Sequence, residues 1–446
     1  MTSLPFLEQF AATYRWPSLP AKRLFRHAKE PNTGMKEDHR LALTLSGVID
    51  RSLDDIEGLQ SSDYSTYQIF EADDLVFKLI DLENIRTSRV GYVPRRGIMS
   101  PAYIRLVKHS GDALSKFYYW FFYAAYINNV FNGMGGGVRQ NLTPTDLLQF
   151  PVPLPDRETQ RAVADFLDRE TARIDRLVER KFGLIKIQKE LRASACLETL
   201  HDGLLGFEWD THEQRYTFEF SSDEWRVKRV KHLVSFMTSG SRGWGDLIRD
   251  DGEVFLQSGN IGRKMDVDFD NVERVEPQTG AEAKRTRVRS GDSLVCITGG
   301  RTGAVGFVEP LPETSYINQH VCLLRPDPTK IAPRLLSQLL WSEIGQAQFT
   351  SAQYGLKQGL GFAEVANVWL PIPPQDLQPQ IVAEIDRRTI RIDALTDQIQ
   401  TSIDVLLERR SALITAAVTG QIDVSEHTRK GDTDRRLDAI EAEMRA

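Results

Sequence analysis

One spacing of acidic and basic residues could serve metal-dependent hydrolysis. Asp270, Glu282 and Lys284 form the pattern D-x(11)-E-x-K, which is loosely the metal-binding arrangement of many nucleases. Such a site needs its carboxylates on buried hairpin strands, where they hold Mg²⁺ and the ion lowers the pKa of bound water. The neighbourhood TGAEAKRTR is polar and loop-like, and the first half of the chain has no equivalent. A metal-dependent DNA nuclease is therefore a minor alternative.

Other patterns that would indicate an enzyme are missing from the sequence. The chain has no G-K dipeptide, which excludes a Walker A phosphate loop. It has no N-P-P-[YF] or D-P-P-[YF] string, the usual base pocket of amino-methyltransferases, so any methylation must come from a partner. The eight histidines show no paired zinc spacing. We therefore expect no catalytic residue, no metal site and no cofactor bound by this chain.

Composition indicates a globular protein of several domains. The 446 residues are 41% hydrophobic and 26% charged, and no run of about 18 apolar residues could span a membrane. Three widely spaced cysteines suit a reducing compartment, so we expect a cytoplasmic protein. The net charge of −6 argues only weakly against nucleic acid as a partner, because the two globular parts are nearly neutral and contain basic clusters.

The chain repeats one proline-rich phrase. FPVPLPDRETQ occupies residues 150–160, and LPIPPQDLQPQ occupies residues 370–380. Other similar strings keep the same order in both halves: DDLV and DSLV, RVGYV and AVGFV, the tryptophans Trp120 and Trp341, RQNL and KQGL, and TARID and TIRID. Several collinear matches are not expected by chance, so the sequence predicts an internal duplication.

Each half consists of a head followed by a long helix. The heads mix short β-type runs, turns and modest helices, which predicts α+β domains. Proline stiffens the phrase P-x-P into a non-helical connector between head and helix. The predicted parts are a first head, a central spacer helix, a second head, a distal spacer helix and a C-terminal tail, at residues 1–153, 154–212, 213–372, 373–425 and 426–446.

Heptad spacing predicts that the two long helices pack against each other as a coiled coil. Lys181 and Gln188 interrupt the seam of the first helix, so neither helix would be stable alone. Packing the two helices as an antiparallel pair with pseudo-twofold symmetry would stabilise both of them. The alternative is that each long amphipathic helix simply covers a core. The residues expected in this packing are Leu167, Ile174, Leu177, Leu184, Leu191, Ile385, Ile392, Leu395, Ile399, Leu406 and Leu413.

These features together resemble the specificity subunits of Type I restriction–modification systems. The resemblance runs from Trp16 to Val424 and includes the string ALITAAVTGQIDV at residues 412–424. It implies that each head is a target-recognition domain for one half of a split DNA sequence, and that the helices set the unread spacer. It also implies two methyltransferase subunits and nuclease–translocase subunits as partners, with S-adenosylmethionine, ATP and Mg²⁺ bound there and not by this chain.

If the heads bind DNA, cations must neutralise phosphates, and other side chains must reach base edges. Arg301 and Gln358 are the leading base-reading candidates in the second head, and Arg96 and Gln140 in the first, because glycine-flanked loops let the backbone approach. The string KRTRVR, residues 284–289, is expected to be a strand that contacts phosphates. The predicted DNA-binding residues are Lys22, Arg23, Arg95, Arg96, Arg139, Gln140, Lys228, Lys231, Arg242, Lys284, Arg285, Arg287, Arg301, Lys357 and Gln358.

A second class of function fits the same architecture. A coiled-coil adaptor whose heads bind other proteins would also show two heads and two long helices. Binding to DNA with a steep dependence on salt would distinguish the recognition subunit from this adaptor.

Overall fold

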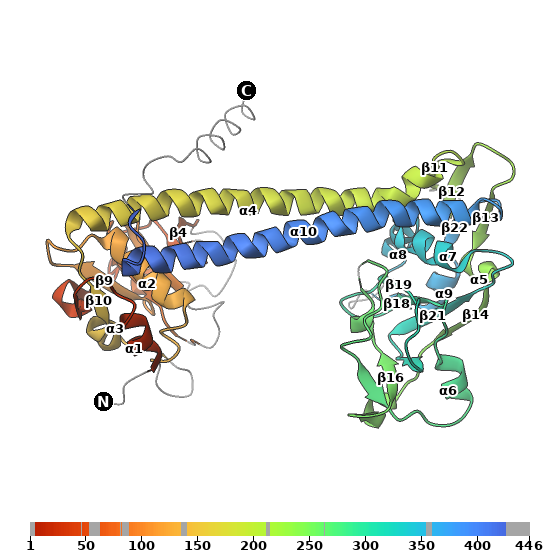
Figure 1. Cartoon of the computed structure of the whole chain (residues 1–446), viewed down its shortest axis with the longest axis horizontal. Coiled ribbons are helices and arrows are strands. Elements are labelled where there is room, and N and C mark those ends of the chain that lie inside the picture. The colour runs from red at the N-terminus through yellow and green to blue at the C-terminus, as the bar shows by residue number, and fades with distance from the viewer. Residues whose placement is uncertain are drawn as a thin grey trace. The chain divides into compact units, whose positions relative to one another are not determined.

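The structure is a computed structural model that describes residues 5–45, 47–52, 63–80, 82, 89–134, 141–210, 215–262, 264–353 and 359–424 (Figure 1). The chain divides into two compact units, Met1–Arg180 with Ser402–Ala446, and Lys181–Thr401. Two long helices, α4 (Arg157–Leu200) and α10 (Gln378–Thr419), contribute to both units. Within the described residues, no helix is both long and apolar enough to cross a bilayer.

The first unit is built around a four-stranded antiparallel sheet in the order β2-β9-β6-β7. Helix α2 (Ser115–Ile127) supplies much of the core, since Phe117, Tyr118, Phe121 and Phe122 are fully buried. The strands and remaining helices of this unit are α1 (Pro5–Ala11), β1 (Ser18–Pro20), η1 (Ala21–Arg23), β2 (Phe25–Ala28), β3 (Leu41–Thr44), β4 (Gly47–Asp50), η2 (Tyr64–Thr66), β5 (Gln68–Phe70), β6 (Leu75–Lys78), β7 (Arg89–Tyr92), β8 (Gly97–Met99), β9 (Ile104–Lys108), α3 (Pro144–Gln149) and β10 (Pro151–Pro153).

The second unit has a four-stranded sheet of the same design, in the order β14-β21-β18-β19, and a second sheet in the order β15-β17-β16-β20. Its strands and helices are β11 (Leu204–Asp210), β12 (Arg215–Phe220), β13 (Arg226–Arg229), α5 (Val230–Leu233), β14 (Val234–Ser239), η3 (Trp244–Leu247), β15 (Ile248–Arg249), β16 (Glu253–Leu256), η4 (Ser258–Asn260), β17 (Glu273–Val275), α6 (Ala281–Thr286), β18 (Ser293–Cys296), β19 (Val305–Phe307), β20 (Ser315–Ile317), β21 (Val321–Pro326), α7 (Pro333–Trp341), α8 (Glu343–Ala352), α9 (Phe362–Ala366) and β22 (Trp369–Ile372).

The two principal sheets correspond strand by strand. In each, the first strand pairs with the last, and the last pairs with the strand that carries the DDLV or DSLV string. The same ion pair links the equivalent strands: Asp73 with Lys108 at 2.8 Å, and Asp292 with Arg325 at 2.7 Å. The predicted α+β heads and their internal duplication are therefore confirmed.

The proline phrases form matched junctions between head and helix. Their first residues become edge strands, β10 paired with β1 and β22 paired with β13. A buried glutamine then opens each long helix: Gln160 Oε1 accepts from the N–H of Leu114, and Gln378 Oε1 accepts from the N–H of Ala332. Leu114 and Ala332 are the residues that precede α2 and α7, so each glutamine ties its long helix to the equivalent head helix.

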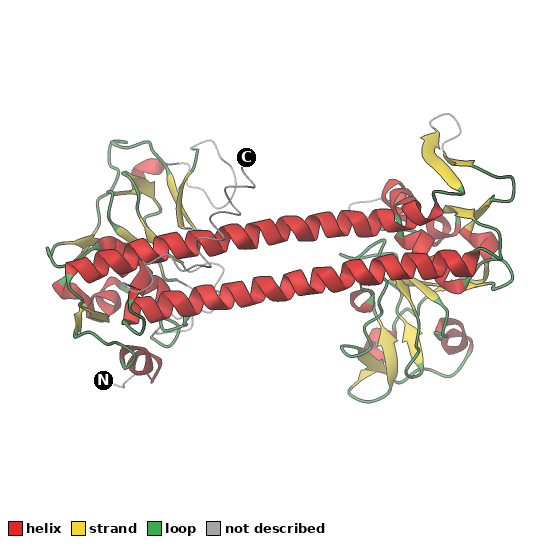
Figure 2. Ribbon diagram, turned by 45° about the horizontal axis from the view of Figure 1, so that its top comes forward, coloured by secondary structure: helices red, strands yellow, loops and turns green. Residues whose placement is uncertain are grey.

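Helices α4 and α10 lie side by side and antiparallel, as predicted (Figures 1 and 2). Within the second unit, Arg192 of α4 contacts Asp393 of α10, and Glu198, further along α4, contacts Arg388, which precedes Asp393 on α10. Residues with restricted exposure recur at spacings of three and four along both helices. They are Leu167, Thr171, Ile174, Val178, Lys181, Ile185, Gln188, Arg192 and Ala195 on α4, and Ile385, Thr389, Ile392, Thr396, Ile399, Ile403, Leu406, Arg410, Leu413 and Ala417 on α10.

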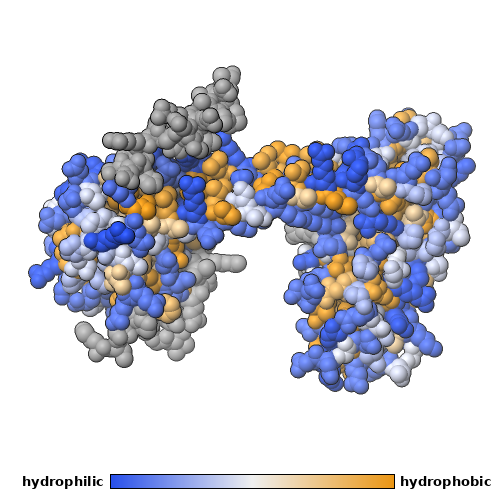
Figure 3. All heavy atoms as spheres, in the orientation of Figure 1, coloured by the Kyte–Doolittle hydropathy of each residue, from blue (hydrophilic) through white to orange (hydrophobic). Residues whose placement is uncertain are grey.

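One of the two predicted heptad registers is wrong in each helix. Leu184 and Leu191 are 46% and 45% exposed, and Leu395 is 41% exposed. Leu177 precedes buried Val178 and is half-buried. The packed positions beside the correct register are filled by residues such as Thr171, Thr389 and Thr396, so leucine spacing alone did not identify them. Apolar side chains instead reach the surface along the helices (Figure 3).

Candidate nucleic-acid interface

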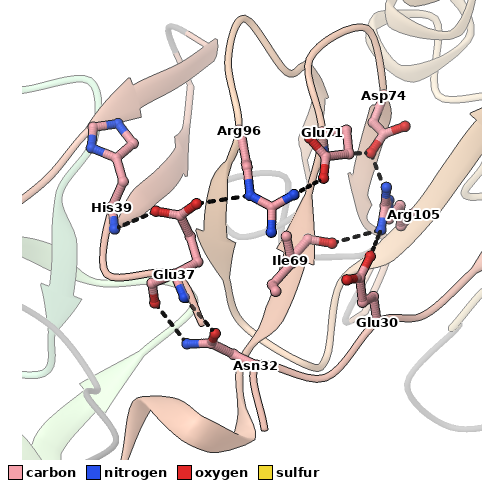
Figure 4. Close-up of polar contacts among 9 residues, drawn as sticks. All are labelled: Glu30, Asn32, Glu37, His39, Ile69, Glu71, Asp74, Arg96 and Arg105. Carbon is pink, nitrogen blue, oxygen red and sulfur yellow. Dashed lines mark hydrogen bonds and ion pairs between the residues drawn. The ribbon is translucent and has the colours of Figure 1, made fainter. Parts of the chain in front are cut away.

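In the first head, Arg96 lies between two carboxylates (Figure 4). Its Nε donates to Glu37 Oε2 at 2.9 Å, and its Nη1 pairs with Glu71. A hydrogen bond from the backbone N–H of His39, together with Arg96, holds the pKa of Glu37 below its ordinary value. Two of its three guanidinium nitrogens are therefore engaged within the head, while the side chain stays 45% exposed, so base reading by Arg96 stays a prediction. Its neighbour Arg95 is 3.5 Å from Asp50 and remains largely exposed.

A second ion pair beside Arg96 is buried. Arg105 Nε donates to Asp74 Oδ2 at 2.6 Å, and Arg105 Nη1 donates to the carbonyl of Ile69 at 2.7 Å (Figure 4). Both charged side chains are at most 7% exposed. Breaking such a pair leaves an uncompensated buried charge. These contacts join β5, β6 and β9, so the pair serves the frame of the head.

Exposed basic residues occupy equivalent turns in the two heads. Lys22 and Arg23 lie on η1, and Lys231 lies on α5, in each case just before the first strand of the principal sheet. Lys231 Nζ donates to Asn367 Oδ1 at 3.0 Å, and Lys228 is half-buried on β13. These turns can supply phosphate contacts. The predicted residues Arg139, Gln140, Lys357 and Gln358 lie outside the described residues.

The second head contains an open cleft of about 1160 Å³, which five segments of the chain assemble. Close packing shapes one wall: a Cβ on Gly240 would lie 2.1 Å from the carbonyl oxygen of Asn318, so only glycine fits there. The described lining residues are Ser239, Arg242, Ser258, Ile297, Thr298, Gly299, Gly300, Thr302, Gln319, His320, Gln353, Gly359, Leu360, Gly361 and Phe362. The glycines allow a ligand to approach the backbone closely.

Three polar side chains of this cleft can recognise base edges. His320 is held in place, because Thr298 Oγ1 contacts its Nδ1 and Asn318 Oδ1 accepts its backbone N–H at 3.0 Å. Its Nε2 lies 3.3 Å from the side-chain nitrogen of Gln319, which is exposed. Arg242 projects from the neighbouring SGSRG turn and is also exposed. Arginine can bridge O6 and N7 of guanine, and glutamine can bridge N6 and N7 of adenine.

Arg301 lies on the loop that forms part of the cleft but does not line it. Its Nη1 donates to the carbonyl of Ile261 at 2.6 Å, and Asp266 and Asp268 lie in the same depression. Arg301 thus holds its loop against the preceding segment. This placement argues against the prediction that Arg301 is the principal base reader.

The predicted KRTRVR strand is wrong, because its first residues belong to helix α6. Lys284 is exposed, Arg285 donates to Thr238 Oγ1 and the carbonyl of Ser239, and Arg287 lies 3.5 Å from Thr314 Oγ1. Ser239 lines the cleft, so Arg285 supports its rim. Glu282 of the nuclease-like pattern pairs with Arg285. Among the described residues, no three His, Cys, Asp or Glu side chains are grouped to hold a metal.

Comparison with known proteins agrees with this architecture. The family model described as the Type I restriction modification DNA specificity domain matches residues 52–181. The Type I restriction enzyme EcoBI specificity subunit of Escherichia coli is 20% identical over 321 residues. That match covers 70% of this chain and 66% of the relative, slightly less than two thirds of its length. The chain is thus similar to a Type I specificity subunit over most of its length, and residues 52–181 match the DNA specificity domain of such systems.

A solved structure shares the fold of this chain. The solved chain, from work on complex assembly and conformational transition of the type I R-M system, superposes with a TM-score of 0.68 at 16% identity. The superposition covers 91% of this chain and 98% of the solved one. The two heads and both long helices therefore belong to a fold that this chain shares with a protein of very different sequence.

Sequence reasoning missed the residues that meet in the cleft of the second head. Gln319 and His320 occupy the short turn between β20 and β21, Thr298 follows β18, and Gln353 follows α8. Only the fold brings these three segments together. The available signal was the polar pair Gln-His between the apolar runs SYI and VCLL, which indicates an exposed turn between buried strands.

Proposed function

We propose that this specificity subunit recognises a bipartite, asymmetric DNA sequence, with one half-site read by each head. The observation that carries the proposal is a repeated frame with divergent reading surfaces. The principal sheets share their strand order, their Asp–Lys or Asp–Arg ion pair and their glutamine junctions. By contrast, Arg242, Gln319 and His320 belong to loops that differ between the halves. Because the two heads share one framework but present different side chains in these loops, we expect them to read two different half-sites.

The helices α4 and α10 would set the length of the unread spacer. They are stiff, antiparallel and joined to each head by an edge strand and a buried glutamine. Half-sites on one face of a duplex recur about every 34 Å, and a rigid connection can match only one separation. Changing the helix length should therefore alter the spacer and leave both half-sites unchanged.

The subunit would recruit catalysis and contribute no catalytic group itself. We propose two methyltransferase subunits and nuclease–translocase subunits as partners, and these would bind S-adenosylmethionine, ATP and Mg²⁺. Apolar side chains at the helix surface, such as Leu184 and Leu191, offer area for such protein contacts. The match of residues 52–181 to the DNA specificity domain and the similarity to the EcoBI specificity subunit support this proposal.

The decisive experiment expresses the subunit with its methyltransferase partner and sequences the methylated genome. We expect one asymmetric motif with two specified halves and a fixed spacer. Duplexes carrying that motif should bind the purified complex, with affinity falling by about a thousandfold between about 50 and 200 mM salt if at least six phosphates are contacted. Methylation that does not depend on this chain, or no duplex binding at low salt, would favour the protein-binding adaptor.

A further inference from the structure

Besides the buried glutamine, each unit has a second polar contact where its head meets the helix pair. The two contacts correspond residue by residue. In the first unit, Arg410 of α10 donates to both carboxylate oxygens of Asp175 on α4, at 2.8 and 3.2 Å. In the second unit, Arg192 of α4 donates to Asp393 of α10 at 2.7 Å. The two aspartates end the TARID and TIRID strings, so the duplication has placed both acceptors. The arginine comes from the opposite helix each time.

Each arginine also contacts an aromatic ring of its head. The guanidinium of Arg192 lies 3.9 Å from the ring centre of Trp341, in the range of a strong cation–π contact. The guanidinium of Arg410 lies 5.7 Å from the ring centre of Tyr123, whose hydroxyl is 3.4 Å from Arg410 Nη1. Trp341 and Tyr123 belong to α7 and α2, the helices that begin beside the buried glutamines. One side chain therefore links three helices in each unit.

The second of these junctions is the more enclosed. The side chain of Arg192 is 10% exposed, compared with 18% for Arg410. Arg192 Nη2 also donates to the carbonyl of Lys264 at 2.9 Å, in a loop of the second head. An adjacent acceptor, Asp386 of α10, binds Arg334 and Gln338 of α7 at 2.6 and 2.8 Å. The head helix is thus held at two neighbouring aspartates.

Both arginines occupy packed heptad positions, where an apolar residue is usual. A buried polar residue at such a position typically fixes register at some cost in stability. Here the arginine fixes more than register, because its other edge contacts the head. Removing it would leave the helix pair packed by its neighbours, while the head would lose a contact that defines its angle.

From this geometry we infer that Arg192 and Arg410 are positioning residues that fix the angle of each head to the helix pair. The positioning role does not depend on the proposed function. Its consequence does, which is that Arg192 and Arg410 limit the DNA spacers that a complex accepts. Without Arg192, the second head should still read the same half-site but accept spacers one base pair shorter or longer.

The first test needs no DNA. Spin labels at Ser290→Cys and Lys189→Cys report the distance between the second head and α4 in the full chain; both positions are exposed, and the three native cysteines are buried. We expect Arg192→Met to broaden the distance distribution at least about twofold, because alternative head angles become populated. Arg387→Met is the matched control, since Arg387 is exposed and pairs only with Glu384 of its own helix in the described structure. An unchanged distance distribution in Arg192→Met would contradict the role of Arg192 in positioning the second head.

Should Arg192→Met fail to fold, Asp393→Asn is measured in the same way. It leaves the stacking on Trp341 in place and removes only the ion pair, so a smaller broadening is expected. Arg192→Lys should restore the charge but not the full set of contacts, and we expect an intermediate width. A lysine variant that behaves like the wild type would show that charge alone suffices and would overturn the geometric role of the guanidinium.

The second test measures methylation by the complex on duplexes with both half-sites and spacers altered by one base pair. We expect Arg192→Met to reduce the preference for the native spacer by about tenfold, the size typical of groups coupled in one network. The preferred bases of both half-sites should stay the same. If Arg192→Met broadens the distances but leaves the spacer preference unchanged, the link between head angle and spacer is wrong. If the wild-type complex recognises no duplex at all, the proposed function itself is contradicted.

Discussion

The two heads share a frame but differ in how their polar side chains are used. In the first head, the described guanidinium groups of Arg96 and Arg105 are turned onto carboxylates of the same head. In the second head, Arg242 and Gln319 are exposed at the cleft. The comparison teaches that a basic residue near a glycine does not indicate a ligand contact until its nearest carboxylate is known.

The largest expected effect concerns the pair of long helices, α4 and α10, to which both heads are joined. Ile185 is 8% exposed, and its neighbour Leu184 is 46% exposed. Ile185→Ala should reduce the free energy of unfolding by about 2–4 kcal/mol, because it leaves a cavity in the helix pair. Leu184→Ala should change it by less than about 0.5 kcal/mol. Denaturant unfolding of both variants checks the register, and equal losses would contradict it.

A substitution in the cleft should affect one half-site only. Arg242→Met removes an exposed cation with potential bidentate contacts to guanine, so binding to the native site should weaken by about 10- to 100-fold. Methylome sequencing should show relaxed preference in the second half-site and an unchanged first one. Arg249→Met, in the same head on β15, is the matched control and should leave both half-sites intact. Equal relaxation of both halves would contradict separate reading by the heads.

The equivalent experiment in the first head should give the opposite result. Arg96→Met leaves Glu37 and Glu71 without their shared partner and should lower the stability modestly, since the contacts are partly exposed. The melting temperature should fall by a few degrees while the sequence read stays the same. Loss of the first half-site without loss of stability would show instead that Arg96 contacts DNA.

The smallest expected effect concerns the cysteines, whose location is another difference between the two units. Cys196, Cys296 and Cys322 all lie in the second unit, and burial raises the pKa of each thiol to about 12. We therefore expect almost no reaction with a thiol reagent at pH 8 in the native protein, and full reaction after unfolding. The labelling rate should follow opening of the second unit alone. Rapid labelling of the native chain would contradict the burial of these thiols.

The sequence predicted the elements better than the contacts. Proline phrases and heptads located both junctions and both long helices, because these patterns act locally. The false leucine register arose because threonine and arginine fill packed positions, as at Thr396 and Arg410. The contacts of Arg301 with Ile261 and of Arg96 with Glu37 join residues that are distant in the chain, so no local pattern predicts them. The cleft of Gln319 and His320 requires five separate segments of the chain, which no local pattern connects.

The first unit closes only with residues that are synthesised after the whole second unit. Ile414, Ala417 and Val418 of α10 belong to its buried core, and the carbonyl of Thr419 accepts the backbone N–H of Arg15 at 2.9 Å. The whole second unit, residues 181–401, lies between these partners in the chain. At about 5–20 residues per second, the ribosome needs on the order of tens of seconds to make it. We therefore expect the inserted unit to fold first during translation, while the N-terminal head waits incomplete and vulnerable to proteases.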